Sequence, residues 1–298
     1  MQQIIRAENI KKQFGTRTAL AGITLEVYKS EVFGIFGFSG SGKTTLIYSL
    51  AGIIKPDAGT VTMSTNTSPA IWFEKPAVDP QLTPFETLWI SATLYGIPRR
   101  KRRSMIRDIL SLVGLDDLRN KPAISFSKGM LKQLEAARAL LSPSEVLLAD
   151  EPMADIDPPT RERLWEHLLA RRASKKHTIL MATSRPQDAE ICDRIALIHE
   201  GRLIACGTLD ELRSATGPEK LIIQPIEAGK SIAKMQQHKG ITAIEQNGSL
   251  IIELSAKVRP SEIIKQMDDE ISAVRLSPRK VDSILAELIA KKEEPTHL

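Results

Sequence analysis

The chain has 298 residues, of which 42% are hydrophobic and 26% are charged, and its formal net charge is +5. These proportions exclude an intrinsically disordered chain, and the length predicts one large domain or two unequal ones. No stretch approaches the roughly 18 uncharged apolar residues that span a bilayer, so we expect no membrane-spanning helix. The two cysteines, Cys192 and Cys206, fall in segments predicted as buried strands. Two isolated thiols without metal-ligand spacing favour a reducing compartment.

The densest basic cluster covers Arg99–Arg103, and Arg107 follows one helical turn later. This pattern is typical of a solvated helix start, and the alternative is contact with anionic lipid headgroups or an acidic partner loop. Nucleic-acid binding is the weakest interpretation because no aromatic residues interleave with these charges. We therefore expect no nucleic-acid partner.

The N-terminal third predicts strands followed by helices. Alternating hydrophobic residues predict half-buried antiparallel strands over Ile4–Ile10 and Ile23–Val27. The apolar run Glu31–Phe36 leads into a glycine-rich loop, and a helix is predicted over Lys43–Ile53. Helical spacing of apolar residues then extends from Thr87 to about Leu118.

Two continuous apolar runs, Val146–Ala149 and Thr178–Ala182, suit parallel strands that are covered on both faces. Between them a helix is predicted, because Asp157 can cap its start and Pro158 fits its first turn. A hairpin is predicted around Glu200-Gly201-Arg202. The alternation of strands and helices predicts an α/β fold.

Composition shifts near Ser214–Pro218, which predicts a linker. The predicted order beyond it is strand, helix, strand, strand, helix, strand, helix, and the first six elements follow a ferredoxin-like unit. Asn247-Gly248 is a strong two-residue hairpin turn, and Ser277-Pro278 precedes an amphipathic helix. The apolar face of that helix comprises Val281, Ile284, Leu285, Leu288 and Ile289. No catalytic constellation occurs here, so we interpret this region as regulatory or dimer-forming.

A phosphate-binding loop follows the strand that ends at Phe36. The motif G-x-x-x-x-G-K-T is complete in Gly37, Phe38, Ser39, Gly40, Ser41, Gly42, Lys43 and Thr44. Its glycines let successive backbone amides face one anion, and the helix that follows adds its N-terminal partial charge. We expect Lys43 to reach the β- and γ-phosphates, the Thr44 hydroxyl to ligate Mg²⁺, and Thr45 to donate to the α-phosphate. The motif alone does not separate kinases, GTPases and motor ATPases.

Two adjacent carboxylates, Asp150 and Glu151, end the apolar run that begins at Val146. We expect Asp150 to hold Mg²⁺ through its water shell, and Glu151 to polarise a water in line with the γ-phosphate. A lone Asp-Glu pair at a strand end is usually only a cap. A phosphate-binding loop about 100 residues earlier favours the catalytic interpretation.

A second candidate anion-binding turn covers Ser125–Met130 and opens a helix predicted over Met130–Leu141. The hydroxyl of Ser127, together with backbone amides at Gly129 and the helix dipole, can bind an anion. Taken alone, this turn favours an ordinary helix cap by Ser127.

The order of these motifs resembles the ABC ATPase family over about the first 215 residues. The segments that carry the resemblance are Gly37–Thr44, Phe126–Met130, Asp150-Glu151-Pro152 and Asp155–Pro158. Phe126–Met130 stands where that family has its LSGGQ signature, which implies that Ser127, Lys128 and Gly129 contact nucleotide. Asp157 stands at the family's D-loop aspartate. The resemblance implies a head-to-tail dimer that ATP joins and hydrolysis releases, with ATP and Mg²⁺ as cofactors.

The resemblance implies an ATPase domain at 1–215, which would have a mixed sheet with a parallel core and a helical subdomain at about 76–142. The element order after the predicted linker indicates a small α+β ferredoxin-like domain at 219–298. The Ser-Lys-Gly-Met turn, the segment Leu94–Pro98 and this small domain are similar to ATPase subunits of bacterial type-two ABC exporters.

Such subunits imply a permease on another chain, engaged through the segment Glu74–Leu94 and the helices after it. They also imply a homodimer or a heterodimer with another ABC ATPase, at the cytoplasmic face of the plasma (inner) membrane.

Three positions leave questions open. Phe14 stands where the family stacks an aromatic residue on adenine, and a core phenylalanine is an equal alternative. Glu74 replaces the Q-loop glutamine and can still ligate Mg²⁺, although it adds negative charge beside the phosphates. Ser184 most closely occupies the position of the histidine that contacts the γ-phosphate and orients Glu151.

We hypothesise that this subunit binds ATP well and hydrolyses it slowly. Loss of the histidine contact to the γ-phosphate would cost a few kcal/mol, or roughly 100-fold in rate.

Two functional alternatives therefore remain: a regulatory half of a heterodimer, or a non-transport ABC protein that acts on a ribosome or nucleic acid. Proteins of the second kind usually have two ATPase halves in one chain or a long coiled-coil insertion. This sequence shows neither feature.

Overall fold

The computed structural model describes residues 2–65, 68–174, 177–216, 220–225, 241–246, 249–254, 260–266, 271–277 and 280–293. Contacts divide the chain into two compact units, Met1–Leu203 and Ile204–Leu298. This division lies earlier than the domain boundary expected at 215–219, which stays a prediction. Within the described ranges, no helix is both long and apolar enough to cross a membrane.

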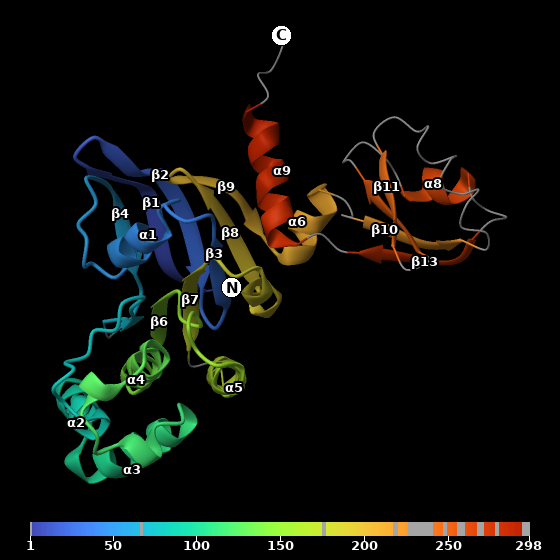
Figure 1. Ribbon diagram of the computed structural model, residues 1–298. Coiled ribbons are helices and arrows are strands. Elements are labelled where there is room, and N and C mark those ends of the chain that lie inside the picture. The colour runs from blue at the N-terminus through green and yellow to red at the C-terminus, as the bar shows by residue number, and fades with distance from the viewer. Residues whose placement is uncertain are drawn as a thin grey trace. The chain divides into compact units, whose positions relative to one another are not determined.

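The first unit alternates strands and helices, as Figure 1 shows. Its strands are β1 (Gln3–Phe14), β2 (Arg17–Tyr28), β3 (Val32–Phe36), β4 (Ala58–Met63), β5 (Ala70–Trp72), β6 (Val146–Asp150), β7 (Thr178–Thr183) and β8 (Arg194–His199). Its α-helices are α1 (Lys43–Leu50), α2 (Pro84–Leu94), α3 (Arg99–Leu112), α4 (Lys128–Leu140) and α5 (Pro158–Ala173). Short 3-10 turns are η1 (Asp116–Leu118), η2 (Ala123–Ser125) and η3 (Pro186–Ile191).

The strands form two sheets, and the larger one positions the site. A three-stranded antiparallel sheet has the order β2-β1-β4. The larger sheet has the order β5-β6-β7-β3-β8-β9, where β9 (Arg202–Gly207) spans the division between the units. Its neighbours from β5 to β8 pair in parallel, which confirms the predicted parallel core.

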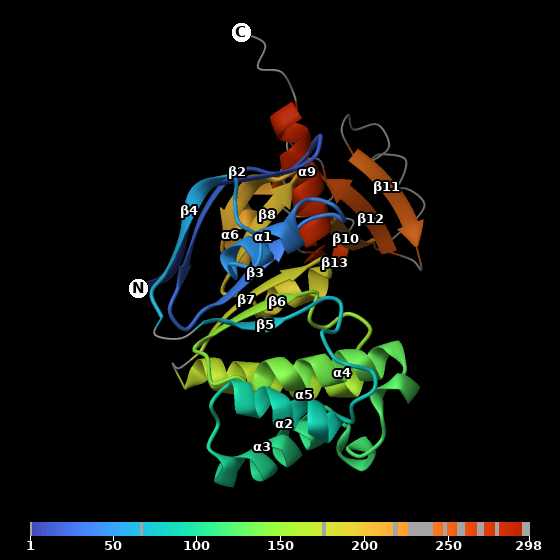
Figure 2. The same ribbon diagram turned by 90° about the vertical axis from the view of Figure 1, so that its left-hand side faces the viewer.

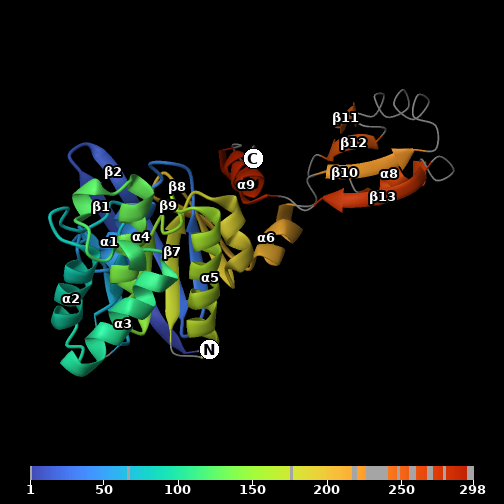
Figure 3. The same ribbon diagram turned by 60° about the horizontal axis from the view of Figure 1, so that its bottom comes forward.

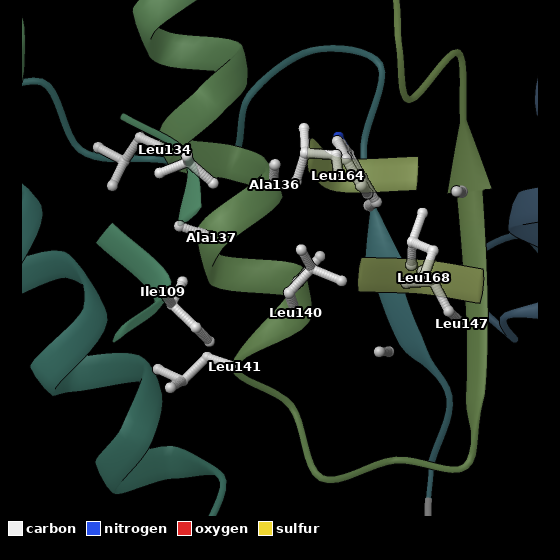
Figure 4. Packing of buried hydrophobic residues seen from close by; sticks show 14 of the residues in the cluster. Ile109, Leu134, Ala136, Ala137, Leu140, Leu141, Leu147, Leu164 and Leu168 are labelled. Atoms are coloured by element: carbon white, nitrogen blue, oxygen red, sulfur yellow. The ribbon is translucent and has the colours of Figure 1, made fainter. Parts of the chain in front are cut away.

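Both faces of the parallel core are covered, as the continuous apolar runs predicted. Side chains alternate along a strand, so Leu147 and Ala149 of β6 join one hydrophobic cluster while Val146 and Leu148 join another. The first cluster includes residues of α2 to α5, and the second includes residues of α1, β1 and β2. Figures 2 and 3 show α4 and α5 together on one face of the strands. Figure 4 shows Leu140 of α4 and Leu168 of α5 packed near Leu147.

The helical pattern expected from Thr87 to Leu118 is divided into α2 and α3. Gly96 has a φ of +69°, which favours glycine, and Pro98 precedes the first residue of α3, so neither supports a continuous helix. At the start of α2, Thr83 and Glu86 form a reciprocal capping box. Helix α4 begins at Lys128, two residues before the predicted start, because Ser127 caps it.

The hairpin between β8 and β9 is confirmed. Its two turn residues, Glu200 and Gly201, have φ of 45° and 71°, as a tight two-residue turn requires. The prediction that both cysteines lie in buried strands is wrong. Cys192 follows η3 and is partly exposed, and Cys206 lies in β9 but is exposed because this strand forms the edge of its sheet.

The second unit contains a small antiparallel sheet. Its elements are α6 (Leu209–Thr216), β10 (Lys220–Pro225), β11 (Ile241–Gln246), β12 (Ser249–Leu254), α8 (Pro260–Gln266), β13 (Ile271–Ser277) and α9 (Val281–Glu293). The order β11-β12-β10-β13, antiparallel at each pairing, suits the predicted ferredoxin-like arrangement. The helix predicted between β10 and β11, and the turn Asn247-Gly248, lie outside the described residues.

Two details of this unit qualify the predictions. The linker expected at Ser214–Pro218 is wrong for residues 214–216, which end helix α6. The amphipathic pattern of α9 is confirmed, because Val281, Ile284 and Leu285 are buried.

The double coverage of β6 predicts a large loss of stability when Leu148 is shortened. Leu148→Ala should lower the free energy of unfolding by about 3 kcal/mol, because a fully buried side chain leaves a cavity. Leu94→Ala is the matched control, since Leu94 is 80% exposed and its loss should change stability by less than about 0.5 kcal/mol. Urea unfolding measures both variants, and equal losses would contradict this account of the core.

Candidate nucleotide site

The glycine-rich loop lies between β3 and α1, at the carboxyl end of the parallel strands. Gly42 has a φ of +105°, and a Cβ there would meet the carbonyl oxygen of Ala19 at 2.4 Å. The loop therefore depends on glycine for its shape at this position. It borders a hollow of about 340 Å³. The hollow is lined by Phe14, Arg17, Ala19, Gly40, Gly42, Lys43, Thr44 and Thr45.

The predicted loop residues differ in exposure. Phe38, Ser39 and Gly40 are exposed at the top of the loop, whereas Gly37 is buried. Ser41 is also buried, and its hydroxyl has no hydrogen-bond partner within the described part of the chain. The middle of the loop, residues 38–40, is thus accessible to solvent, whereas Gly37 and Ser41 on either side are buried.

Lys43 places its ammonium group inside the loop. Its side chain is buried, and Nζ donates to the carbonyl oxygens of Gly37 at 2.9 Å and Phe38 at 3.1 Å. Burial lowers the pKa of Lys43, while the carboxylates of Glu151, Asp150 and Glu74 oppose that shift. The loop therefore encloses a lysine with carboxylates beside it, an arrangement that suits a phosphate chain with a bound cation.

Asp150, at the end of β6, carries a carboxylate that is only half satisfied. The Thr44 hydroxyl donates to Oδ1 at 3.2 Å, whereas Oδ2 is buried and accepts no hydrogen bond from any described residue. Burial, opposed by the Thr44 hydrogen bond and reinforced by Glu74 and Glu151, raises the pKa of Asp150 to about 6. An unpaired buried carboxylate oxygen is unfavourable, and a hydrated Mg²⁺ would supply both charge and donors. Thr44 and Asp150 therefore fit a magnesium site.

Glu151 is half-buried and has an unusual backbone conformation. Its φ is +44°, which is strained for a residue other than glycine. Its N–H donates to the carbonyl oxygen of Ala182 in β7 at 2.8 Å. Its own carbonyl oxygen accepts from the N–H of Ala154 and, at 3.2 Å, from Nζ of Lys132. These contacts fix the carboxylate-bearing turn against the end of β7.

Glu74 and Ser184 lie beyond the ends of β5 and β7, the two strands that flank β6. Glu74 is exposed, two residues after β5, and its charge affects the pKa values of Lys43 and Asp150. Ser184 is exposed and directly follows β7. The carboxyl ends of adjacent parallel strands share one edge of the sheet, where open α/β sheets bind ligands. The structure thus brings both residues to the edge that carries Asp150.

Phe14 ends β1, and its ring is 49% exposed. The alternative of a core phenylalanine is therefore wrong. The ring lines the hollow beside Arg17, and Nζ of Lys12 lies 5.5 Å from the ring centroid.

The second candidate anion-binding turn is packed against a different loop. Ser127 caps α4 by accepting from the N–H of Met130 at 3.3 Å, so the cap interpretation is confirmed. Lys128 forms an ion pair with Asp155 at 2.8 Å. A Cβ on Gly129 would lie 2.8 Å from the carbonyl oxygen of Asp155. This turn and the loop before α5 therefore form one packed group.

Asp157 caps α5 as predicted. Its Oδ1 accepts from the N–H of Thr160 at 3.0 Å, and its Oδ2 accepts from Nε2 of Gln133 in α4 at 2.8 Å. Asp157 thus joins the start of α5 to the middle of α4.

Motif reasoning missed two buried charges on α4. Lys132 is 2% exposed and holds the carbonyl oxygen of Glu151, and Glu135 is fully buried and accepts from the N–H groups of Phe73 and Ala77. The sequence carries a signal only for Glu135, whose neighbours Leu134 and Ala136 are both apolar.

The fold and the site define a P-loop nucleotide-binding domain. The family described as ABC transporter matches residues 20–154. The chain is 33% identical over 220 residues to "Nod factor export ATP-binding protein I" of Ralstonia nicotianae, covering 70% of this chain and 68% of that protein. It is 30% identical over 237 residues to "Daunorubicin resistance ATP-binding protein DrrA3" of Streptomyces coeruleorubidus, covering 76% of this chain and 75% of that one. The chain therefore belongs to the ATP-binding subunits of ABC transporters.

Further comparisons agree. "Linearmycin resistance ATP-binding protein LnrL" of Bacillus subtilis is 31% identical over 230 residues, which cover 74% of each protein. A solved structure described as the ATP binding subunit of an ABC transporter superposes with a TM-score of 0.66 at 25% identity, covering 71% of this chain and 92% of that one. The cassette fold predicted from the motifs is thus confirmed.

The raised pKa of Asp150 predicts how stability changes with pH. The folded protein binds this proton more tightly than the unfolded chain, whose ordinary value is 3.8, so the carboxyl destabilises the nucleotide-free fold as pH rises from about 4 to 6. Asp150→Asn should therefore gain about 2 kcal/mol relative to wild type between about pH 4.5 and pH 7.5. Urea unfolding in a chelator measures this gain, and a variant that follows wild type at both pH values would contradict it.

Proposed function

We propose that this chain is the ATP-binding and ATP-hydrolysing subunit that powers an ABC export complex. The observation that carries the proposal is the hydrogen bond between Thr44 of the phosphate-binding loop and buried Asp150, beside the half-buried carboxylate of Glu151. A nucleotide on the loop would place its γ-phosphate near the two carboxylates that hydrolysis requires.

The proposed roles follow from position. The loop amides and Lys43 bind the phosphates, Thr45 donates to the α-phosphate, and the exposed ring of Phe14 stacks on adenine. Thr44, Glu74 and Asp150 hold Mg²⁺, which supplies positive charge to the phosphate oxygens. Glu151 orients the attacking water and accepts its proton.

ATP-driven head-to-tail dimerisation completes the proposal. Ser127 and Lys128 are exposed at the start of α4, so their hydroxyl, amides and helix dipole are accessible to an anion on another subunit. In the dimer, Ser127, Lys128 and Gly129 of one copy contact the nucleotide on the other copy's loop, and Asp157 lies at the joint between α4 and α5. A homodimer and a heterodimer with another ABC ATPase both satisfy this geometry.

The proposed partner is a membrane-spanning permease on another chain. Two large apolar side chains of α2, Ile90 and Leu94, are 46% and 80% exposed, which supports a docking surface within Glu74–Leu94. The names of the relatives, which refer to Nod factor export and to daunorubicin and linearmycin resistance, support outward transport. The complex would place this subunit at the cytoplasmic face of the plasma (inner) membrane.

We further propose an ATPase domain at 1–215, with its helical subdomain at about 76–142, and a regulatory or dimer-forming domain at 219–298. Three α-helices, α2, α3 and α4, lie within the bounds of the proposed helical subdomain.

Ser184 supports a second candidate function, a slowly hydrolysing regulatory half of a heterodimer. It directly follows β7, at the strand whose Ala182 carbonyl binds the N–H of Glu151. A serine there carries no positive charge and is shorter than histidine. A histidine-bearing paralogue would then supply the productive site.

Steady-state ATP hydrolysis by the purified subunit tests both candidates. The main proposal expects Glu151→Gln to abolish turnover, because the attacking water loses its base. The hypothesis of slow hydrolysis expects low wild-type turnover that Ser184→His raises by about 10- to 100-fold.

The control is Ser111→His, an equal substitution at an exposed serine near the end of α3, which lies outside the proposed nucleotide site. Ordinary transporter rates in the wild-type homodimer would contradict slow hydrolysis. Turnover that survives Glu151→Gln would contradict the assigned catalytic carboxylate.

A further inference from the structure

The segment that carries Glu74 is held by a single buried carboxylate on α4. Glu135 is fully buried, and its Oε1 accepts from the N–H of Phe73 at 3.0 Å while its Oε2 accepts from the N–H of Ala77 at 3.1 Å. One side chain therefore binds the backbone on both sides of residues 74–76. These two hydrogen bonds, together called the staple, fix both ends of the 74–76 loop. Among the bonds described for these residues, none joins Glu135 to the Glu74 side chain.

Arg138, one turn further along α4, orients the staple. Its Nε donates to Oε2 of Glu135 at 3.0 Å and its Nη2 donates to Oε1 at 2.5 Å, a bidentate pair. Nη2 also donates to the carbonyl oxygen of Ile71 at 2.7 Å, and the guanidinium lies 5.3 Å from the ring centroid of Phe73. The pair thus contacts the segment at Ile71, Phe73 and Ala77.

A second bond from the same guanidinium reaches α2. Nη1 of Arg138 donates to the hydroxyl of Tyr95, the residue that follows α2, at 3.2 Å. Burial acts to lower the pKa of Arg138, but its hydrogen bond to Glu135 and the charge of Glu135 raise it, so the guanidinium stays charged.

Stability alone does not account for this ion pair. Desolvating two charges costs free energy that their attraction offsets only when the geometry is good, and apolar replacements of buried pairs are often neutral or stabilising. Here all four partners of Glu135 are donors with good geometry, and two of them are backbone groups that flank one loop. The arrangement favours a role in fixing the position of that loop.

We propose that Glu135 is a positioning residue for Glu74, and that Arg138 orients Glu135. The staple holds the 74–76 loop so that the Glu74 carboxylate stays at the edge of the sheet that carries Lys43 and Asp150. Because α4 is capped by Ser127, this contact connects the proposed magnesium ligand to the helix that would meet the partner subunit's nucleotide. The inference rests on the proposed function, in which Glu74 ligates Mg²⁺.

The test compares nucleotide affinity with and without Mg²⁺, using a fluorescent ATP analogue and the full chain. Glu135→Gln keeps the size of the side chain but places an amide N–H₂ against a backbone N–H, so one anchor is lost. We expect the Mg²⁺ concentration for half-maximal tight binding to rise about tenfold, as for partners that orient a metal ligand, while affinity in a chelator stays unchanged. Glu162→Gln, at an exposed position of α5, is the matched control and should change neither quantity.

A double-mutant cycle separates positioning from general damage. In a Glu74→Ala background, which removes the ligand oxygen, Glu135→Gln should cause no further change in Mg²⁺ dependence, because its effect acts through Glu74. Arg138→Lys keeps the charge but loses the bidentate geometry, so it should also raise the Mg²⁺ concentration for half-maximal tight binding, by less than Glu135→Gln does. It serves as the second variant if Glu135→Gln does not fold.

Three results would overturn the positioning role: an additive effect in the Glu74→Ala background, equal losses of affinity with and without Mg²⁺, or wild-type Mg²⁺ dependence in folded Glu135→Gln and Arg138→Lys. Failure of the proposed function would be seen in nucleotide binding itself. Either wild type would bind no nucleotide, or Lys43→Ala would bind nucleotide as well as wild type does. If Glu74→Ala does not change Mg²⁺ dependence while Lys43→Ala abolishes binding, the metal role of Glu74 and the positioning role fail together, and ATP binding stands.

Discussion

The buried carboxylate of Asp150 is the constraint around which the first unit is organised. Strand β6 is covered on both faces, so its last residue is buried, close enough to Lys43, Glu74 and Glu151 for their charges to affect its pKa. The Thr44 hydroxyl satisfies one carboxylate oxygen, and the other remains without a partner among the described residues. This charge is unfavourable in the chain alone and favourable beside a hydrated cation. The same packing that stabilises the sheet thus prepares a site for magnesium and phosphate.

Helix α4 connects that site to the proposed dimer surface. It is capped by exposed Ser127, and along its buried side Lys132 donates to the carbonyl oxygen of Glu151 while Glu135 accepts from the backbone on both sides of Glu74. These three hydrogen bonds connect one helix to both carboxylate-bearing turns. The start of α4 is also where the proposed partner nucleotide binds, so dimerisation and hydrolysis would share one element.

The sequence predicts the local motifs well because each depends on neighbouring residues. The phosphate-binding loop, the parallel strands around Asp150 and the caps at Ser127 and Asp157 follow from short patterns, and the structure contains each of them. Contacts between distant segments were harder to predict. The exposure of Phe14 depends on where β1 ends relative to the loop, and that of Cys206 depends on β9 being an edge strand. The bonds of Glu135 join residues about 60 positions apart, which no local pattern specifies.

The measurement that tests the central claim most directly is the mass of the Glu151→Gln variant in solution, by sedimentation, with ATP and Mg²⁺ and then with ADP. The account predicts a two-chain species with ATP, a single chain with ADP, and loss of the two-chain species when Ser127→Asp is added, because aspartate keeps the helix cap but places a carboxylate against the partner's phosphates. A single chain at saturating ATP, or a two-chain species unaffected by Ser127→Asp, would contradict the shared nucleotide site.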